Sequence, residues 1–224
     1  METAHTHSII QEVIQRHKNR LTASDDSEWG YRFTVFKDVF SPFIAPSGRL
    51  GLTFASLPDF RGKRVLDVGC GSGIIACLMA INGASKVVGI DINPSAIANA
   101  ERNSNNLKLT EKLEFRLGSL LTPVQEEESF DIVYADLPFT DGIPNDVLEA
   151  AFYDPQLNSI KKLTETFPTV RGLQSAKLYL AISESDADEL RTFASSNQLS
   201  WNDFISYKLP WINLQIAELS RKVE

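Results

Sequence analysis

The chain has 224 residues, of which 43% are hydrophobic and 23% charged, and this composition suits one soluble α/β domain with an extension. Its longest apolar run, residues 74–81, is too short to span a bilayer, and its N-terminus lacks the basic and apolar stretches of a secretory signal, so we expect a cytoplasmic protein without a membrane partner. The net charge of -7 argues against a protein that coats a nucleic-acid backbone unaided, because such coating needs clustered Lys and Arg.

The beginning of the chain differs in character from the rest. Residues 7–21 place apolar side chains at helical spacing, which predicts an amphipathic helix. Residues 22–30 form a polar break. Residues 31–57 are rich in Phe and interrupted by Pro and Gly, which indicates strand and turn pieces leading into a short helix. We expect residues 1–60 to be an N-terminal extension that covers the main domain rather than forming a core of its own.

Strands and helices alternate in the main domain, residues 61–224. The predicted strands are residues 63–68, 86–92, 113–117, 130–135 and 177–183, followed by two closing strands within residues 201–221. The predicted helices are residues 74–82, 94–107 and 186–197. This alternation predicts an α/β fold with a doubly wound, mostly parallel seven-stranded sheet that has helices on both faces. We expect the last segment to close one edge with a single antiparallel strand.

A glycine-rich loop, VLDVGCGSG, joins the first of these strands to the helix that follows it. Gly69, Gly71 and Gly73 would let the backbone approach a ligand closely at the helix N-terminus. Their spacing is G-x-G-x-G, which differs from the G-x-G-x-x-G of nicotinamide-binding loops. Asp67 precedes the loop and would repel a pyrophosphate, whereas it suits a cationic ligand such as S-adenosylmethionine (SAM), which carries sulfonium and ammonium groups.

A second acid follows at the end of the next strand. Asp91 comes eighteen residues after Gly73, at the edge of the sheet where a ribose diol would bind. Asp67, the three glycines and Asp91 in one strand-loop-helix-strand unit resemble the class I SAM-dependent methyltransferases. The resemblance is close from residue 61 to about residue 139 and looser over the remainder. It implies a Rossmann-like methyltransferase fold, with SAM as cofactor and residues 61–224 as the SAM-binding domain.

The same resemblance implies a role for each cofactor-site residue. Asp67 and the glycines would cradle the methionine end of SAM, and Asp91 would bind both ribose hydroxyls. Ile92 would lie against the adenine, and Ser119 and Leu120 would line its far edge. The family often has an acid where this chain has Ser119.

The stretch Asp136-Leu137-Pro138-Phe139 follows the fourth predicted strand, where one branch of this superfamily carries Asn/Asp-Pro-Pro-Tyr/Phe. That branch methylates glutamine amides and the exocyclic amines of adenine and guanine. The lone pair of a planar amine is delocalised, so acceptors for its N–H groups help to aim it at the methyl group. Asp136 and the Leu137 carbonyl could accept those bonds, while Pro138 fixes the turn and Phe139 stacks on the flat acceptor. Leu137 and Phe139 depart from the commoner residues, and the alternative is a plain strand end closed by an acid and a turn proline.

These patterns predict a SAM-dependent methyltransferase that acts on a planar nitrogen of a protein side chain, a nucleobase or a small metabolite. Three alternatives stay open, namely a small-molecule O-methyltransferase, a nicotinamide-dependent oxidoreductase and a non-catalytic SAM-binding subunit. Residues 40–42 and 153–155 are candidates for the border of the acceptor pocket. The sequence leaves the acceptor and the oligomeric state undetermined.

The remaining candidates for redox or metal chemistry are few. Cys70 and Cys77 lie in an apolar segment, where we expect them to be small apolar fillers rather than members of a disulfide framework. His5, His7 and His17 have no partners at metal-ligand spacing, and we expect them outside the core. The sequence therefore predicts no metal site.

Overall fold

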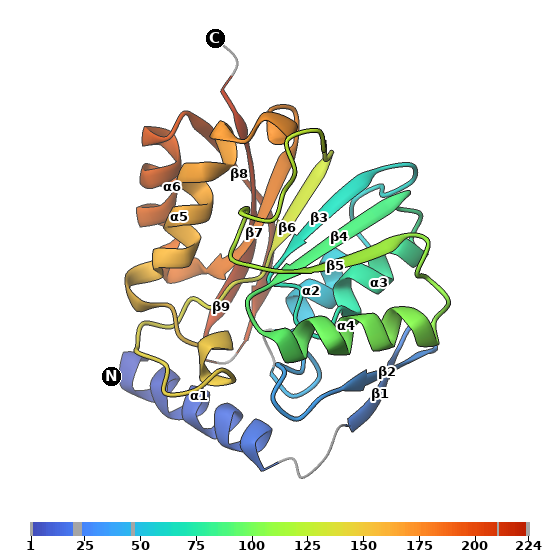
Figure 1. The fold of residues 1–224 in the computed structure, drawn as a ribbon. Coiled ribbons are helices and arrows are strands. Elements are labelled where there is room, and N and C mark those ends of the chain that lie inside the picture. The colour runs from blue at the N-terminus through green and yellow to red at the C-terminus, as the bar shows by residue number, and fades with distance from the viewer. Residues whose placement is uncertain (1, 20–23, 46–47, 210, 223–224) are drawn as a thin grey trace.

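The computed structural model describes residues 2–19, 24–45, 48–209 and 211–222. A sheet of seven strands forms its centre (Figure 1). Its strands are β3 (Arg64–Val68), β4 (Lys86–Asp91), β5 (Leu113–Leu117), β6 (Ile132–Ala135), β7 (Lys177–Ser183), β8 (Leu199–Lys208) and β9 (Asn213–Arg221). They lie in the order β5-β4-β3-β6-β7-β9-β8, and β9 runs antiparallel to both of its neighbours. The predicted doubly wound sheet with one antiparallel strand is therefore confirmed. Pro210, between the two closing strands, lies outside the described residues.

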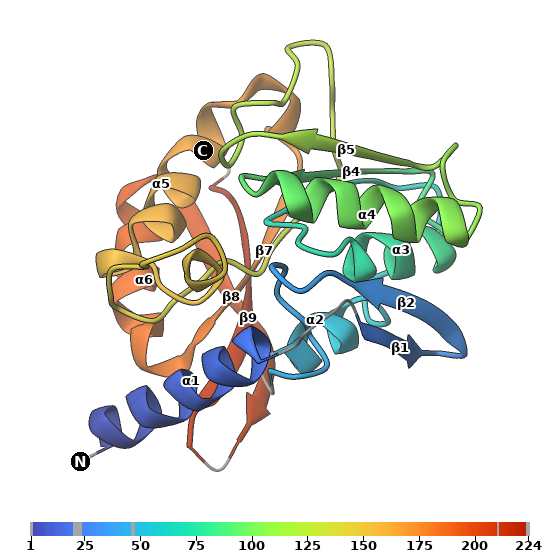
Figure 2. The same ribbon diagram turned by 60° about the horizontal axis from the view of Figure 1, so that its bottom comes forward.

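Helices cover both faces of this sheet (Figure 2). On one face lie α2 (Gly48–Phe54), α3 (Ile74–Ile81) and α4 (Pro94–Asn106), and on the other lie α5 (Asn158–Thr166) and α6 (Ala187–Ser196). Successive side chains of a strand point to opposite faces, so Val65 joins the core beneath α2 and α3 while Leu66 joins the core beneath α5 and α6. Short 3-10 turns occur at Glu149–Ala151, Pro155–Leu157, Phe167–Thr169, Arg171–Leu173 and Glu184–Asp186.

The N-terminal segment begins with α1 (Glu2–Lys18), so the predicted helix is present but starts and ends earlier. A hairpin of β1 (Ser24–Glu28) and β2 (Tyr31–Val35) follows, and the expectation of a polar break over residues 22–30 is wrong for β1. The polar β1 is a strand because its backbone pairs with β2. Positive φ angles at Trp29 and Gly30 make the tight turn between them.

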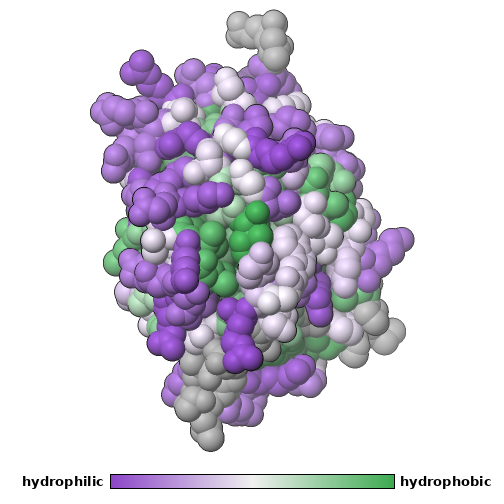
Figure 3. Space-filling view, turned by 90° about the vertical axis from the view of Figure 1, so that its right-hand side faces the viewer, coloured by the Kyte–Doolittle hydropathy of each residue, from purple (hydrophilic) through white to green (hydrophobic). Residues whose placement is uncertain are grey.

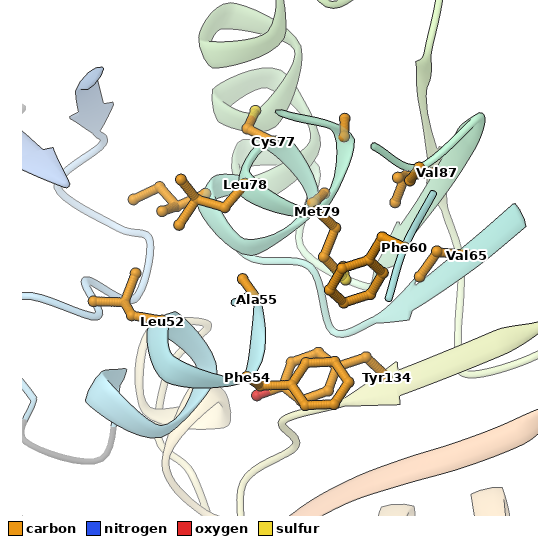
Figure 4. Close-up of a cluster of buried hydrophobic side chains, with 14 of the residues drawn as sticks. Leu52, Phe54, Ala55, Phe60, Val65, Cys77, Leu78, Met79, Val87 and Tyr134 are labelled. Atoms are coloured by element: carbon orange, nitrogen blue, oxygen red, sulfur yellow. The ribbon is translucent and has the colours of Figure 1, made fainter. Parts of the chain in front are cut away.

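The segment before residue 61 shares the core of the main domain. Phe33 of β2 and Phe54 of α2 are fully buried in the same cluster as Val65 of β3. Phe54 also stacks on Tyr134 of β6, with ring centroids 4.4 Å apart (Figure 4). This packing fixes α2 against the sheet next to the end of β6.

The outer surface is mixed. The face on the side of α4 and the β1–β2 hairpin is mostly hydrophilic, with small hydrophobic patches between the polar residues (Figure 3). Within the described parts of the chain, no helix is long and apolar enough to cross a membrane.

Candidate functional site

A cavity of about 430 Å³ opens at the C-terminal ends of β3, β4 and β6. The chain order of the strands reverses on either side of β3, and ligands of open α/β sheets bind at such a point. The sequence-predicted site residues that line the cavity are Asp67, Gly69, Gly71, Asp91, Ile92, Ser119, Leu120, Asp136, Leu137, Pro138 and Phe139. The structure thus brings together the predicted cofactor residues and the Asp136 stretch, and leaves only Gly73 outside the lining.

The glycine loop needs its glycines for two different reasons. Gly71 has a φ of 51°, and a Cβ built there would meet nothing within 4 Å, so the backbone faces open space. Gly73 has a φ of 72°, and a Cβ there would lie 2.6 Å from the Cβ of Ala100 in α4. Gly71 therefore leaves room for a ligand, whereas Gly73 allows α3 and α4 to pack closely.

Backbone groups on both sides hold Asp91, at the end of β4. The N–H of Gly71 donates to Oδ2 at 2.8 Å, and the N–H of Asn93 donates to Oδ1 at 2.9 Å. Burial raises the pKa of Asp91, and these N–H groups oppose that rise. The next residue, Ile92, is 60% exposed at the cavity wall although it is apolar. The pair presents a fixed carboxylate beside a flat apolar surface, which suits a ribose with its attached base.

Asp67 lies deeper, with 2% of its surface exposed. Its Oδ2 is buried and has no hydrogen-bond partner among the described residues. Burial, followed by the negative charges of Asp136 and Asp91, raises the pKa of Asp67 to about 8. A buried acceptor without a donor is costly, so this oxygen is suited to a ligand that brings a donor and a positive charge.

The charged residues of the cavity wall all have one sign. They are Asp38, Asp67, Asp91, Asp136 and Asp154, and no Lys, Arg or His is among the described residues that line the cavity. An all-acidic wall disfavours phosphate and favours a cation. The partnerless oxygen of Asp67, the open space at Gly71 and this charge pattern together fit SAM, whose methionine end is cationic.

Asp136 lies at the end of β6 and is partly exposed to the cavity. The hydroxyl of Tyr134 donates to its Oδ2 at 3.4 Å. Burial raises the pKa of Asp136 to about 7, and the bond from Tyr134 opposes that rise. Tyr134 was not among the site residues predicted from the sequence. The two-residue period of a strand, which puts residues 134 and 136 on one face, was the available signal.

Segments that are far apart in the sequence cover the rest of the cavity. The apolar and aromatic lining residues of these segments are Ile9, Ile10, Val13, Phe40, Pro42, Val147, Phe152, Tyr153, Trp211 and Ile212. Of the border candidates, Phe40, Pro42 and residues 153–155 line the cavity, whereas Ser41 is fully buried beside it.

Helix α1 is attached to this cover by His17, and the expectation that His17 lies outside the core is wrong. Its ring is fully buried and lies 5.5 Å from the ring of Phe40 and 5.2 Å from that of Phe152. The N–H of Ser41 donates to Nε2 at 3.0 Å, so Nδ1 carries the proton and donates to the carbonyl of Val13 at 2.8 Å. Docking of α1 on distant segments buries this histidine, which the local sequence could not indicate.

Polar contacts also tie α1 to the loop after β6. The ammonium of Lys18 pairs with Asp146 at 2.9 Å and with Glu149 at 2.5 Å. The amide of Gln11 donates to the hydroxyl of Tyr153. The side of the cavity next to α1 is therefore closed by contacts between elements more than 100 residues apart.

Redox and metal chemistry have little support in the described residues. Cys70 and Cys77 are free and buried, and burial raises the pKa of both thiols, so they are poor nucleophiles. Over the described ranges, no group of three or more His, Cys, Asp or Glu is arranged to hold a metal ion.

Comparisons with known proteins agree with this geometry. A family model described as a methyltransferase domain matches residues 59–215. The ribosomal protein L11 methyltransferase of Klebsiella pneumoniae is 38% identical over 101 residues, which are 44% of this chain and 33% of that protein. The corresponding protein of Deinococcus radiodurans is 40% identical over 82 residues, covering 35% of this chain and 30% of that protein. The match thus spans about a third of the length of these curated relatives.

Solved structures with the same fold have low sequence identity to this chain. The ribosomal protein L11 methylase of Lactobacillus delbrueckii superposes with a TM-score of 0.60 at 18% identity, covering 83% of this chain and 82% of that chain. A tRNA methyltransferase of M. jannaschii superposes with a TM-score of 0.65 at 17% identity, covering 92% of this chain and 59% of that chain. At such identity the likeness concerns the fold alone.

Proposed function

Because the chain belongs to the methyltransferase domain family of class I SAM-dependent enzymes, we propose that it methylates a nitrogen atom placed beside Asp136. The observation that carries this proposal is that Asp136 and the SAM-type loop line one cavity. The acceptor's place at the end of β6 then lies beside the cofactor's place at the ends of β3 and β4.

The cofactor is SAM, which supplies an electrophilic methyl group on a positively charged sulfur when bound. We propose that Asp67 and the glycine loop bind its methionine end, and that the Asp91 carboxylate binds the ribose hydroxyls. Ile92 would pack on the adenine, with Ser119 and Leu120 at its far edge. The partnerless Oδ2 of Asp67 and the two backbone bonds that fix Asp91 support this assignment.

The residues after β6 would orient the acceptor. Asp136 and the carbonyl of Leu137 can accept hydrogen bonds from a planar N–H group, Pro138 fixes the turn, and Phe139 offers a ring for stacking. Alignment of this kind contributes up to about 7–11 kcal/mol to a displacement reaction. This arrangement supports the branch with an Asn/Asp-Pro-Pro-Tyr/Phe loop, with Leu137 in place of its first proline.

The acceptor that suits the cavity is an uncharged nitrogen group without a nearby phosphate. The named relatives act on ribosomal protein L11 and on tRNA. The all-acidic cavity wall and the net charge of -7 favour a protein side chain or a small molecule over RNA. We further propose that residues 1–60 form the cover on the acceptor side of the SAM-binding domain, residues 61–224, because α1 and residues 38–40, 42, 45 and 48 line that side.

One observation favours a second candidate, methylation of an acidic hydroxyl of a small molecule. The pKa of Asp136, raised to about 7 by burial, is near the value at which a general base works best at neutral pH. In that reaction Asp136 would remove the hydroxyl proton, whereas in the first candidate it accepts a hydrogen bond from an N–H group.

Transfer of label from methyl-labelled SAM tests the proposal. Purified protein is incubated with separated protein, RNA and small-molecule fractions of cells, in parallel with Asp136→Ala and with the surface variant Asp59→Ala. We expect label in the protein or small-molecule fraction with wild type and Asp59→Ala, and little with Asp136→Ala. Label found only in RNA would overturn the acceptor class. Calorimetric binding of NAD in place of SAM, or SAM binding without transfer to any fraction, would overturn the function.

A further inference from the structure

Tyr134 is a buried polar residue to which neither the sequence pattern nor the proposed reaction gives a role. It lines the cavity, yet only 1% of its surface is exposed. A buried phenol needs a hydrogen-bond partner, and Asp136 Oδ2, at 3.4 Å, is positioned to be that partner. The two side chains lie on the same face of the chain at the end of β6, as the strand period requires.

Helix α2 is shaped around this pair. Phe54 stacks on the Tyr134 ring with planes 12° apart, which fixes the ring in position. At Gly51 a Cβ would lie 2.9 Å from the Tyr134 hydroxyl and 3.4 Å from Asp136 Oδ2. Any larger residue at this position would therefore crowd the hydroxyl and the carboxylate.

We propose that Tyr134 is a positioning residue, whose hydroxyl holds one oxygen of the Asp136 carboxylate, keeps the group ionised and leaves its other oxygen for the acceptor. This inference rests on the proposed role of Asp136 in acceptor binding. It explains why a phenol occupies an otherwise apolar core position, where Phe would stack on Phe54 equally well.

The other charged groups near the pair do not replace this interaction. Burial, followed by the negative charges of Asp136 and Asp67, raises the pKa of Tyr134, so the proton stays on its hydroxyl and Asp67 offers Asp136 no positive charge. Across the interface with α2, the facing residues are Gly51 and Phe54, and Arg49 is turned outward to pair with Glu28 at 3.5 Å. Among the described residues, Tyr134 is therefore the neighbour that can stabilise the ionised form of Asp136.

Tyr134→Phe tests the inference, and Tyr179→Phe is its matched control. Tyr179 packs on the same Phe54, at 5.0 Å, but its hydroxyl donates to Glu218 at 2.7 Å, away from the cavity. The pKa of Asp136 is measured in each purified protein by NMR titration of isotope-labelled aspartate, with Asp136→Asn to assign the signal. We expect Tyr134→Phe to raise this pKa by about 0.5–1 unit and Tyr179→Phe to leave it unchanged.

Kinetics give a second readout once an acceptor is found. In Tyr134→Phe the acidic limb of the kcat profile should move to higher pH by the same amount, with the KM for SAM unchanged. An unchanged pKa of Asp136 in Tyr134→Phe, or equal shifts in both Phe variants, would overturn the inference. A raised pKa together with full transfer by Asp136→Ala would uphold the link between the two residues and overturn the proposed function instead.

Discussion

The two halves of the cavity are built in opposite ways. The half that we assign to the cofactor comes from one continuous stretch, residues 64–120, in which strand ends and backbone N–H groups place each functional atom. The half that we assign to the acceptor is assembled from α1, residues 38–40, 42, 45 and 48, the loop after β6, and residues 209, 211 and 212, and side-chain packing places its atoms. The first half depends on local geometry and the second on long-range docking. Substitutions in the two halves should therefore affect different kinetic constants.

The largest effect is expected at the junction of the halves, at Asp136. If the carboxylate accepts a hydrogen bond from the target N–H, Asp136→Ala should lose about a hundredfold or more in transfer rate. Asp136→Asn should keep measurable transfer, because an amide carbonyl accepts the same bond. SAM affinity, measured by calorimetry, should survive in both. Equal inactivity of the two variants with intact SAM binding would point to a general base and to methylation of oxygen.

The cofactor half is tested at Asp91. Asp91→Ala removes a carboxylate that two backbone N–H groups hold in place, and it should cost about 1–3 kcal/mol of SAM affinity, roughly 5- to 150-fold. Asp59→Ala makes the same charge change on an exposed residue and should leave the affinity unchanged. Unaltered SAM binding by calorimetry in Asp91→Ala would remove Asp91 from the site.

A smaller effect concerns the stability of the ligand-free cofactor half. Burial raises the pKa of Asp67 to about 8, so the folded protein keeps a proton that the unfolded chain loses near pH 4. The stabilisation from this group is complete below that pH and is lost as the pH rises towards 8.

The unfolding temperature of wild type should accordingly fall between pH 5 and pH 8. The fall in the unfolding temperature of Asp67→Asn over the same range should be smaller by about 2–6 °C. Asp67→Asn should also weaken SAM binding, because the ionised group is the one that suits a cation. Asp59→Asn is the control, since hydrogen bonds from Arg61 lower the pKa of Asp59 to about 2, well below this window. If the unfolding temperatures of wild type and Asp67→Asn fall equally between pH 5 and pH 8, Asp67 does not titrate in this range.

The sequence predicted the cofactor half well because its signals are local. Strand β5 has the predicted bounds, and β3 and β4 differ from prediction by a single residue at one end. The glycines of the loop, except Gly73, and the acids at the strand ends line one cavity, while their role in binding a cofactor stays a prediction. These features are set by residues within one strand-loop-helix-strand unit, so periodicity and turn chemistry are sufficient to predict them.

One missed element, α5, has a local cause, and the other features that were missed depend on distant partners. Helix α5 was not predicted, because it is short and follows two residues with positive φ, Gln156 and Leu157. Strand β1 has no apolar pattern and exists through its pairing with β2. His17 was expected outside the core, and it is buried because α1 packs against Phe40 and Phe152. The acceptor half consists mostly of such elements.

The smallest effect separates the halves most cleanly, at the contact between α1 and the loop after β6. Lys18→Met removes the ion pairs with Asp146 and Glu149 while keeping the length of the side chain. Both ion pairs are partly exposed, so we expect the KM for the acceptor to rise only about twofold to fivefold. The KM for SAM should not change, because within the described residues no ion pair or hydrogen bond joins Lys18 to the glycine loop.

Arg16→Met makes the same change on the exposed side of α1 and should leave both constants unchanged. Added salt should raise the acceptor KM of wild type towards that of Lys18→Met, because screening weakens the same ion pairs. The hydrogen bonds from Lys18 lower the pKa values of Asp146 and Glu149, so both acids are ionised at neutral pH. The difference in acceptor KM between wild type and Lys18→Met should therefore persist at neutral pH. It should disappear at the low pH at which these acids take up protons. If Lys18→Met instead weakens SAM binding and leaves the KM for the acceptor unchanged, α1 belongs to the cofactor half. The division of the cavity into these two halves would then be wrong.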